Sequence, residues 1–150
     1  MKLYLDNCCY NRPFDDQQQL KIHLETQAKL YIQQKIKDGQ YDLVWSYILE
    51  YENAKNPYEE KKNAIIPWKK IAKEYVYENE NIISYAEEQG KKGIKTFDAL
   101  HIACAVQSEC DVFLTTDKKL LNTPQNDIRV INPIDFVREM EGWQWQKQIH

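Results

Sequence analysis

Lys2-Leu3-Tyr4-Leu5-Asp6-Asn7 is the stretch on which the fold prediction rests. Its short run of apolar, β-prone residues predicts a buried strand. The strand ends at an acid, and open α/β sheets bind their ligands at the carboxyl ends of the strands. Asp6 is equally compatible with a cap of the following turn. The rest of the chain decides between these two interpretations.

The composition is that of one globular domain. The chain has 150 residues, of which 43% are hydrophobic and 29% charged, and this length is sufficient for a single core. The formal net charge of −3 argues against a protein that coats nucleic acid. This net charge is still compatible with a few basic residues around an acidic site. Arg12 and Lys118 are candidates for contacts with substrate phosphate. Solvent exposure is the simpler interpretation of both side chains.

Cysteine spacing and hydropathy indicate the compartment. Cys8, Cys9, Cys104 and Cys110 form no CxxC pair, so zinc and thioredoxin-type sites have no support. We expect buried, reduced thiols. No apolar run reaches the roughly 20 residues of a membrane span, and no signal segment leads the chain. We therefore expect a cytoplasmic protein that makes no use of a membrane.

Strand and helix patterns alternate along the chain. Strands are expected after the first one at 42–46, 75–77, 111–116 and 128–131. Helices are expected at 17–38, 46–51, 57–75 with a break near Pro67, 81–89, 96–106, 118–121 and 133–140. Strands that alternate with helices predict a parallel sheet covered on both faces. We expect one three-layer α/β/α domain over residues 1–150, with no placeable pattern in the tail from Gly142.

Local signals define two of the helices. A four-residue repeat in the first long helix predicts one buried stripe, formed by Leu20, Leu24, Ala28, Ile32 and Ile36. Gly39 stands where a left-handed helix end is expected. Asn56 and Pro57 predict the start of a later helix through a cap and a first-turn proline.

Four acids are expected to meet at one edge of the sheet. Asp6 and Asp117 follow strands, and Glu50 lies about one turn into the helix after the second strand. Asp98 lies in the first turn of an apolar helix, where the helix N-terminus favours an ionised carboxylate. Because the carboxyl ends of parallel strands share one edge, the four side chains converge there, and the simple cap interpretation of Asp6 becomes the weaker one.

Converging carboxylates require a cation. Two like charges about 4 Å apart cost about 4 kcal/mol at an effective dielectric near 20, so such a group either takes up protons or binds a metal. Oxygen ligands favour Mg²⁺ or Mn²⁺ over Zn²⁺, and Asn7, Thr115 and Thr116 can support them by hydrogen bonding. A metal ion of this kind suits phosphodiester hydrolysis.

Four stretches carry a resemblance to a known family. They are Leu3–Asp6, Ser46–Glu50, Phe97–Ala103 and Leu114–Asp117. The two most specific of these stretches are the ones that contain Asp98 and Asp117. On these stretches the chain resembles the PIN-domain nucleases. That family includes the virulence-associated-protein-C-like ribonuclease toxins of bacterial toxin–antitoxin pairs.

The resemblance implies a fold and an activity. It implies a mostly five-stranded parallel sheet and one or two Mg²⁺ or Mn²⁺ ions held by Asp6, Glu50, Asp98 and Asp117. It further implies endonucleolytic cleavage of single-stranded RNA, a homodimer, and an antitoxin protein as partner. The family often has a hydroxyl residue after the first aspartate, where this chain has Asn7, and an amide can still orient a metal-bound water.

Several nearby residues have two interpretations each. His101 lies one turn after Asp98 and is either a catalytic base or a hydrogen-bonded core residue. Glu52 can replace Glu50, but it points to another side of its helix. Aromatic residues near the edge either stack on bases or pack in the core, and these are Tyr10, Trp45 and Tyr51.

Two other functions compete with the nuclease. The first is a PIN-type module that binds RNA or protein without cleaving anything, although four intact acids argue against it. The second is a phosphoacceptor receiver domain, which has a similar sheet and an acidic pocket. It requires paired acids and a late lysine in a pattern that this sequence does not clearly have.

Overall fold

The computed structural model describes residues 1–10 and 20–149, and the side chains of these residues as far as residue 142. The strands are β1 (Lys2–Leu5), β2 (Asp42–Ser46), β3 (Glu74–Val76), β4 (Val112–Leu114) and β5 (Arg129–Ile131). The helices are α1 (Leu20–Lys37), α2 (Tyr47–Ala54), α3 (Glu59–Ile71), α4 (Glu80–Gly90), α5 (Thr96–Gln107), α6 (Lys118–Asn122) and α7 (Pro133–Ile149). A short 3₁₀ turn, η1 (Asn7–Cys9), follows the first strand.

The five strands form one parallel sheet in the order β3-β2-β1-β4-β5. The first strand lies at the centre, where Leu3 pairs with Leu43 on one side and with Val112 on the other. The predicted α/β fold with a five-stranded parallel sheet is confirmed. Receiver domains of the flavodoxin-like type order their strands 2-1-3-4-5, so the receiver interpretation is wrong.

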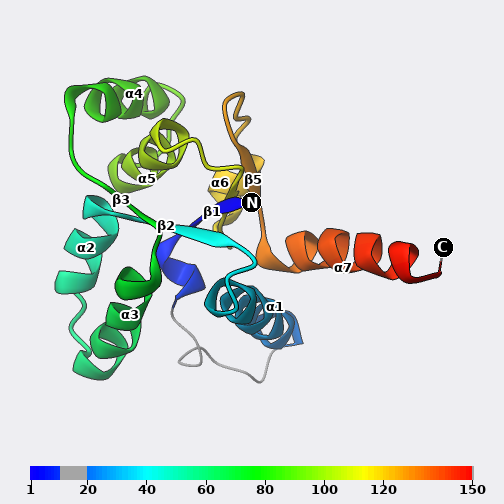
Figure 1. Cartoon of the computed structure of the whole chain (residues 1–150). Coiled ribbons are helices and arrows are strands. Elements are labelled where there is room, and N and C mark those ends of the chain that lie inside the picture. Colours follow the sequence, from blue (N-terminus) through cyan, green and yellow to red (C-terminus); the bar gives the residue numbers. More distant parts are fainter. Residues whose placement is uncertain (11–19, 150) are drawn as a thin grey trace.

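Helices cover both faces of the sheet, with α4 and α5 on one side and α1, α3 and α7 on the other (Figure 1). Tyr4 of β1 points toward α5, where its ring meets His101 at 5.7 Å between centroids. On the opposite face, Trp45 and Tyr10 pack edge to face at 5.4 Å, and Trp68 of α3 lies against Tyr10. The central strand is therefore buried from both sides.

The helix α1 departs from the predicted stripe. Ala28, Ile32 and Ile36 are buried as expected, whereas Leu20 is 72% and Leu24 46% exposed. The four-residue repeat continues through the whole helix, but only its second half packs on the sheet. The left-handed end at Gly39 is confirmed, with φ of +78°.

The boundaries of α3 and α7 also differ from the predictions. The side chain of Asn56 accepts a hydrogen bond from the Tyr58 amide at 3.0 Å, so it forms a local turn and α3 begins only at Glu59. The helix runs without interruption past Pro67 and ends at Ile71. In α7 the helical backbone extends to Ile149, well beyond the predicted end at residue 140.

The four cysteines are free thiols, as predicted, but Cys8 is only partly buried, whereas Cys9, Cys104 and Cys110 are buried. Among the described residues, no helix is both long enough and apolar enough to cross a lipid bilayer.

Candidate active site

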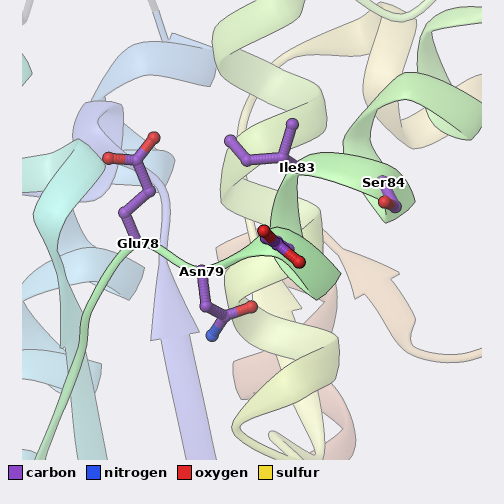
Figure 2. Close-up of a pocket in the computed structure, with 5 residues that line it drawn as sticks. Glu78, Asn79, Ile83 and Ser84 are labelled. Carbon is purple, nitrogen blue, oxygen red and sulfur yellow. The ribbon is translucent and has the colours of Figure 1, made fainter.

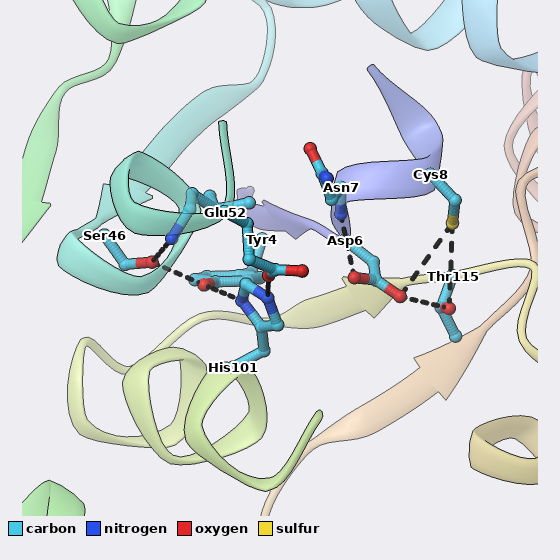
Figure 3. A network of polar contacts seen from close by, with 9 residues as sticks. Tyr4, Asp6, Asn7, Cys8, Ser46, Glu52, His101 and Thr115 are labelled. Atoms are coloured by element: carbon cyan, nitrogen blue, oxygen red, sulfur yellow. Dashed lines mark hydrogen bonds and ion pairs between the residues drawn. The ribbon is translucent and has the colours of Figure 1, made fainter. Parts of the chain in front are cut away.

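Asp6 lies at the carboxyl end of the central strand and is held by its own backbone and by β4. Its amide donates to the Leu114 carbonyl at 2.9 Å. Its Oδ1 accepts from the Asn7 amide at 2.8 Å, and its Oδ2 accepts from the Thr115 hydroxyl at 2.7 Å. Figure 3 shows the carboxylate between Asn7 and Thr115. With 8% of its surface exposed, this acid has a fixed orientation.

Thr115 connects Asp6 to Asp117. The threonine is fully buried, and its hydroxyl accepts from the Asp117 amide at 3.1 Å while it donates to Asp6. Asp117 is exposed and caps α6, because its Oδ1 accepts from the amides of Lys119 and Leu120. One oxygen of Asp117 thus serves the helix, and the other remains for a ligand.

The negative charges of Asp6 and Asp117 act on the carboxyl of Asp98. Burial, together with the negative charges of Asp6 and Asp117, raises its pKa to about 6, while the charge of His101 acts in the opposite direction. A smaller increase comes from Glu52. The helix α5 therefore brings this carboxyl to the same edge as the two acids that follow β1 and β4.

Glu52 is the fourth acid at this edge. Its Oε1 contacts Nε2 of His101, and its charge acts on Asp98. The opposite ring nitrogen, Nδ1 of His101, lies 2.6 Å from the Tyr4 hydroxyl, which in turn lies 2.6 Å from Oγ of Ser46. These four side chains form a continuous chain of polar contacts (Figure 3).

Glu50 takes a different direction from the same helix. Its Oε2 accepts from the Trp45 indole at 2.9 Å, and its Oε1 lies 3.2 Å from the Lys69 ammonium of α3. Its charge acts on Tyr75 of β3 and is not among the charges that shift Asp98. The structure thus places Asp6, Asp98 and Asp117 together with Glu52 instead of Glu50. We call Asp6, Glu52, Asp98 and Asp117 the acidic set.

The helical pattern of α2 contains the signal for Glu52. Ile48, Leu49 and Asn53 are the buried residues of this helix. Glu52 lies four residues after Ile48, so both fall on the face that packs inward. The distance in sequence from the strand end points to Glu50, whereas the helix periodicity points to Glu52.

The turn η1 is anchored from α1. Lys29, 3% exposed, donates to the Cys8 carbonyl at 2.9 Å, and Gln33 donates to the Cys9 carbonyl at 3.0 Å. The Cys8 thiol lies 3.8 Å from Oδ2 of Asp6. These contacts hold the first turn after β1 and thereby the backbone that orients Asp6.

The supporting residues have distinct roles. The buried Oδ1 of Asn7 has no hydrogen-bond partner among the residues that the structure describes. The amide of Thr116 points at the Cys8 sulfur at 3.5 Å, and Lys118 is exposed at the first position of α6. Arg12 lies outside the described residues.

The chemistry of these donors suits a hard divalent cation. The acidic set offers carboxylate oxygens, and the side-chain oxygen of Asn7 is a buried acceptor with no donor in the part of the chain that the structure describes, which is typical of a position that a metal or its water completes. Within residues 1–10 and 20–142, no three His, Cys, Asp or Glu side chains already enclose a metal position. The donors are therefore suitable in kind and share an edge, but they do not form a closed shell.

An open pocket elsewhere is a poor alternative site. It lies where α4 begins and is lined by Glu78, Asn79, Glu80, Ile83 and Ser84, which Figure 2 draws as sticks. No member of the acidic set lines it, and its charged side chains are both acidic. Such a lining would repel a phosphate backbone.

Solved structures share this fold, although sequence comparison finds no relative. No protein-family model and no curated protein matches the chain. The structure of VapBC2 from Rickettsia felis bound to a DNA fragment from its promoter matches with a TM-score of 0.56 and 14% identity, over 88% of this chain and 98% of the other. The structure of VapBC-1 from nontypeable Haemophilus influenzae matches with a TM-score of 0.52 and 19% identity, over 89% and 98%. The PIN-like fold that the sequence resemblance implies is confirmed.

Proposed function

We propose that this protein is a Mg²⁺- or Mn²⁺-dependent endoribonuclease that hydrolyses phosphodiester bonds of single-stranded RNA. One observation carries the proposal: the Thr115 hydroxyl joins Asp6 to Asp117 at the carboxyl edge of a PIN-like sheet, and Asp98 responds to the charge of both. Carboxylates that three separate elements bring to one edge of the sheet are the ligand type that such a metal ion requires.

Asp6, Asp98 and Asp117 are the proposed metal ligands, with Glu52 as a fourth ligand or as the group that orients the attacking water. A bound Mg²⁺ or Mn²⁺ would supply charge neutralisation at the phosphate and a more acidic water. The side-chain oxygen of Asn7, which follows Asp6 and has no donor among residues 1–10 and 20–142, is suited to accept a hydrogen bond from that water. Glu50, paired with Lys69, has no direct role in this proposal.

The fold likeness extends the proposal to a partner. The two similar structures are VapBC assemblies, and we propose that this chain is likewise the toxin of a toxin–antitoxin pair. Its partners would be RNA, an antitoxin protein and a second copy of the chain, and its compartment would be the cytoplasm. Growth arrest on expression, abolished by Asp6→Asn, tests the toxin role.

The nuclease itself is tested with purified protein and an unstructured single-stranded RNA. Wild type should cleave with Mg²⁺ or Mn²⁺, and EDTA should stop the reaction. Asp6→Asn and Asp98→Asn should each lose about 100-fold in activity or more, because loss of a group that only supports a metal ligand already costs about 10- to 100-fold. Asp127→Asn alters an exposed aspartate that bonds Tyr85 and should cleave normally.

Cleavage by both acid variants at the wild-type rate would refute the proposal. RNA binding by the wild type without any cleavage would favour the alternative, a PIN-type module that binds RNA or protein without catalysis.

A further inference from the structure

Two exposed aromatic residues directly precede members of the acidic set in the sequence. Tyr51 of α2 is 43% exposed and Phe97 of α5 is 44% exposed. Their ring centroids are 5.7 Å apart, with the planes inclined at 54°, so the pair spans the contact between the two helices. Large aromatic rings usually gain stability from burial, and both of these leave a considerable area in water.

The sequence neighbours of these rings are the acids. Tyr51 directly precedes Glu52, and Phe97 directly precedes Asp98. Because Glu52 and Asp98 interact electrostatically, the ring pair and the acid pair connect the same two helices at the same level. A nucleic acid whose phosphate reaches the acidic set would therefore meet the same pair of helices that carries the rings.

A cation completes the arrangement. The Lys55 ammonium, one helical turn after Tyr51, lies over the Tyr51 ring at 4.4 Å from its centroid, so a base would stack on the face of the ring that the ammonium leaves open. A ring with an adjacent ammonium matches the two parts of a nucleotide, since the base stacks on the ring and the phosphate meets the cation. This local positive charge also opposes the repulsion that the acidic set exerts on RNA.

The other aromatic residues at this edge are unsuitable for stacking. Tyr10 is 2% and Trp45 1% exposed, and each packs against the other in the core. Of the three aromatic residues considered from the sequence, Tyr51 alone presents a ring to solvent.

We propose that Tyr51 and Phe97 form a stacking subsite for one nucleobase of single-stranded RNA, next to the scissile phosphodiester, with Lys55 contacting a flanking phosphate. This inference rests on the proposed ribonuclease function. Stacking is tolerant of base identity because every base has a π-face, so the subsite would provide affinity and positioning more than sequence recognition.

Paired substitutions separate stacking from packing. Tyr51→Leu and Phe97→Leu keep an apolar side chain and remove the ring, whereas Tyr51→Phe and Phe97→Tyr keep the ring. Tyr58→Leu is the matched control, because Tyr58 is 62% exposed with Lys61 at 4.8 Å over its ring, but its sequence neighbours are outside the acidic set. Thermal unfolding of every variant should match wild type.

Binding is measured by the fluorescence anisotropy of a short, unstructured, fluorescein-labelled oligoribonucleotide in EDTA, so that no cleavage occurs. Each leucine variant should raise the Kd for this RNA by roughly 5- to 100-fold, which is about the cost of losing the stacking of one base on an aromatic ring. The ring-retaining variants and Tyr58→Leu should bind like wild type. Removal of one base from the oligoribonucleotide should weaken its binding to wild type. The same abasic oligoribonucleotide should bind Tyr51→Leu almost as well as the intact one does, because that variant already lacks the ring.

Cleavage of the same RNA with Mn²⁺ distinguishes this inference from the proposed function. Leucine variants with a raised KM and a nearly unchanged kcat support the subsite. Leucine variants that bind and cleave like wild type overturn the subsite and leave the nuclease intact. Ring-dependent binding by a wild type that never cleaves overturns the nuclease alone, and a wild type that neither binds nor cleaves overturns both.

Discussion

His101 holds the carboxylate of Glu52 from inside the core. Its Nε2 contacts Oε1 of Glu52, and its Nδ1 lies 2.6 Å from the hydroxyl of Tyr4. Tyr4 and His101 are essentially inaccessible to solvent, so neither ring can turn without breaking buried polar contacts. When Tyr4 donates to Nδ1, the proton of a neutral imidazole is on Nε2, where it faces Glu52. His101 is therefore a core residue that orients a site residue.

Substitution of the two glutamates of α2 should have opposite outcomes. We expect Glu52→Gln to reduce kcat for RNA cleavage by about 10- to 100-fold, the cost of a lost ligand or supporting group. Glu50→Gln should change kcat less than about 3-fold, because its partners are Trp45 and Lys69. Cleavage kinetics with Mn²⁺ measure both. A large loss in the Glu50 variant with a small one in the Glu52 variant would reverse the assignment.

Two substitutions of His101 should differ in their effect on metal binding. In His101→Gln the amide nitrogen reaches approximately the position of Nε2, so the donor to Glu52 is retained. In His101→Asn the amide instead replaces Nδ1 near Tyr4, and Glu52 loses its donor. We expect the Mn²⁺ concentration for half-maximal cleavage to rise about 10-fold in the asparagine variant and less in the glutamine variant.

Thermal unfolding of the two histidine variants supplies the control. Both lose one buried polar contact of about 1 kcal/mol, so a purely structural role predicts similar losses of stability and similar metal dependence. Equal Mn²⁺ requirements in the two variants would show that His101 does not position Glu52.

Topology explains why three of the acids could be predicted from the sequence. Asp6 and Asp117 follow recognisable strands, and the parallel order forces their strand ends to one edge. Asp98 could be predicted to lie at this edge because an acid in the first turn of an otherwise apolar helix requires a polar environment. These inferences depend on element order alone, which hydrophobic periodicity reveals well.

The fourth acid depends on helix rotation, which sequence order does not determine. Glu50 and Glu52 are two residues apart, about 200° around the helix, and packing against α5 and the sheet decides which one faces Asp98. The exposed Leu20 and Leu24 of α1 illustrate the same difficulty. An apolar stripe predicts which face of a helix is apolar, but not how far along the helix other elements pack against that face. Tertiary contacts decide both cases.

The pH dependence should follow the carboxyl of Asp98. Its pKa is about 6 in the folded protein against an ordinary value of 3.8 for an aspartate, so the folded state binds the proton more tightly than the unfolded state. In the metal-free protein, this group therefore contributes stability that is lost as pH rises from about 4 through 6. Mn²⁺ binding, which needs the ionised carboxylate, should instead tighten as pH rises through about 6.

Asp98→Asn should consequently stabilise the metal-free protein at pH 7. We expect the free energy of unfolding to rise by about 1 kcal/mol, reduced from the full electrostatic value because the carboxyl is only half-buried. Urea unfolding of wild type and variant at pH 4 and pH 7 provides the measurement. An equal difference between the two proteins at both pH values would exclude a raised pKa at Asp98.

Metal binding should stabilise the protein through the same carboxylates. A ligand that binds only the folded state raises stability with its concentration, by about 2.7 kcal/mol at 100 times its Kd. We expect Mn²⁺ to raise the Tm of wild type and to have little effect on Asp6→Asn. Mg²⁺ should act in the same direction, and EDTA should reverse both effects. A Tm of the wild type that is indifferent to both ions would contradict the metal site.

The Thr115 hydroxyl should be essential for the link between Asp6 and Asp117. Thr115→Val keeps the shape of the side chain but removes both the donor to Oδ2 of Asp6 and the acceptor for the Asp117 amide. We expect a loss of about 1–3 kcal/mol in unfolding free energy, because buried polar groups lose their partner, and a weaker Mn²⁺ response. Thr115→Ser keeps the hydroxyl and should restore the Mn²⁺ response while it leaves a small methyl-sized cavity. If valine and serine variants require the same Mn²⁺ concentration for cleavage, Thr115 serves packing alone and the two aspartates are positioned by their backbones.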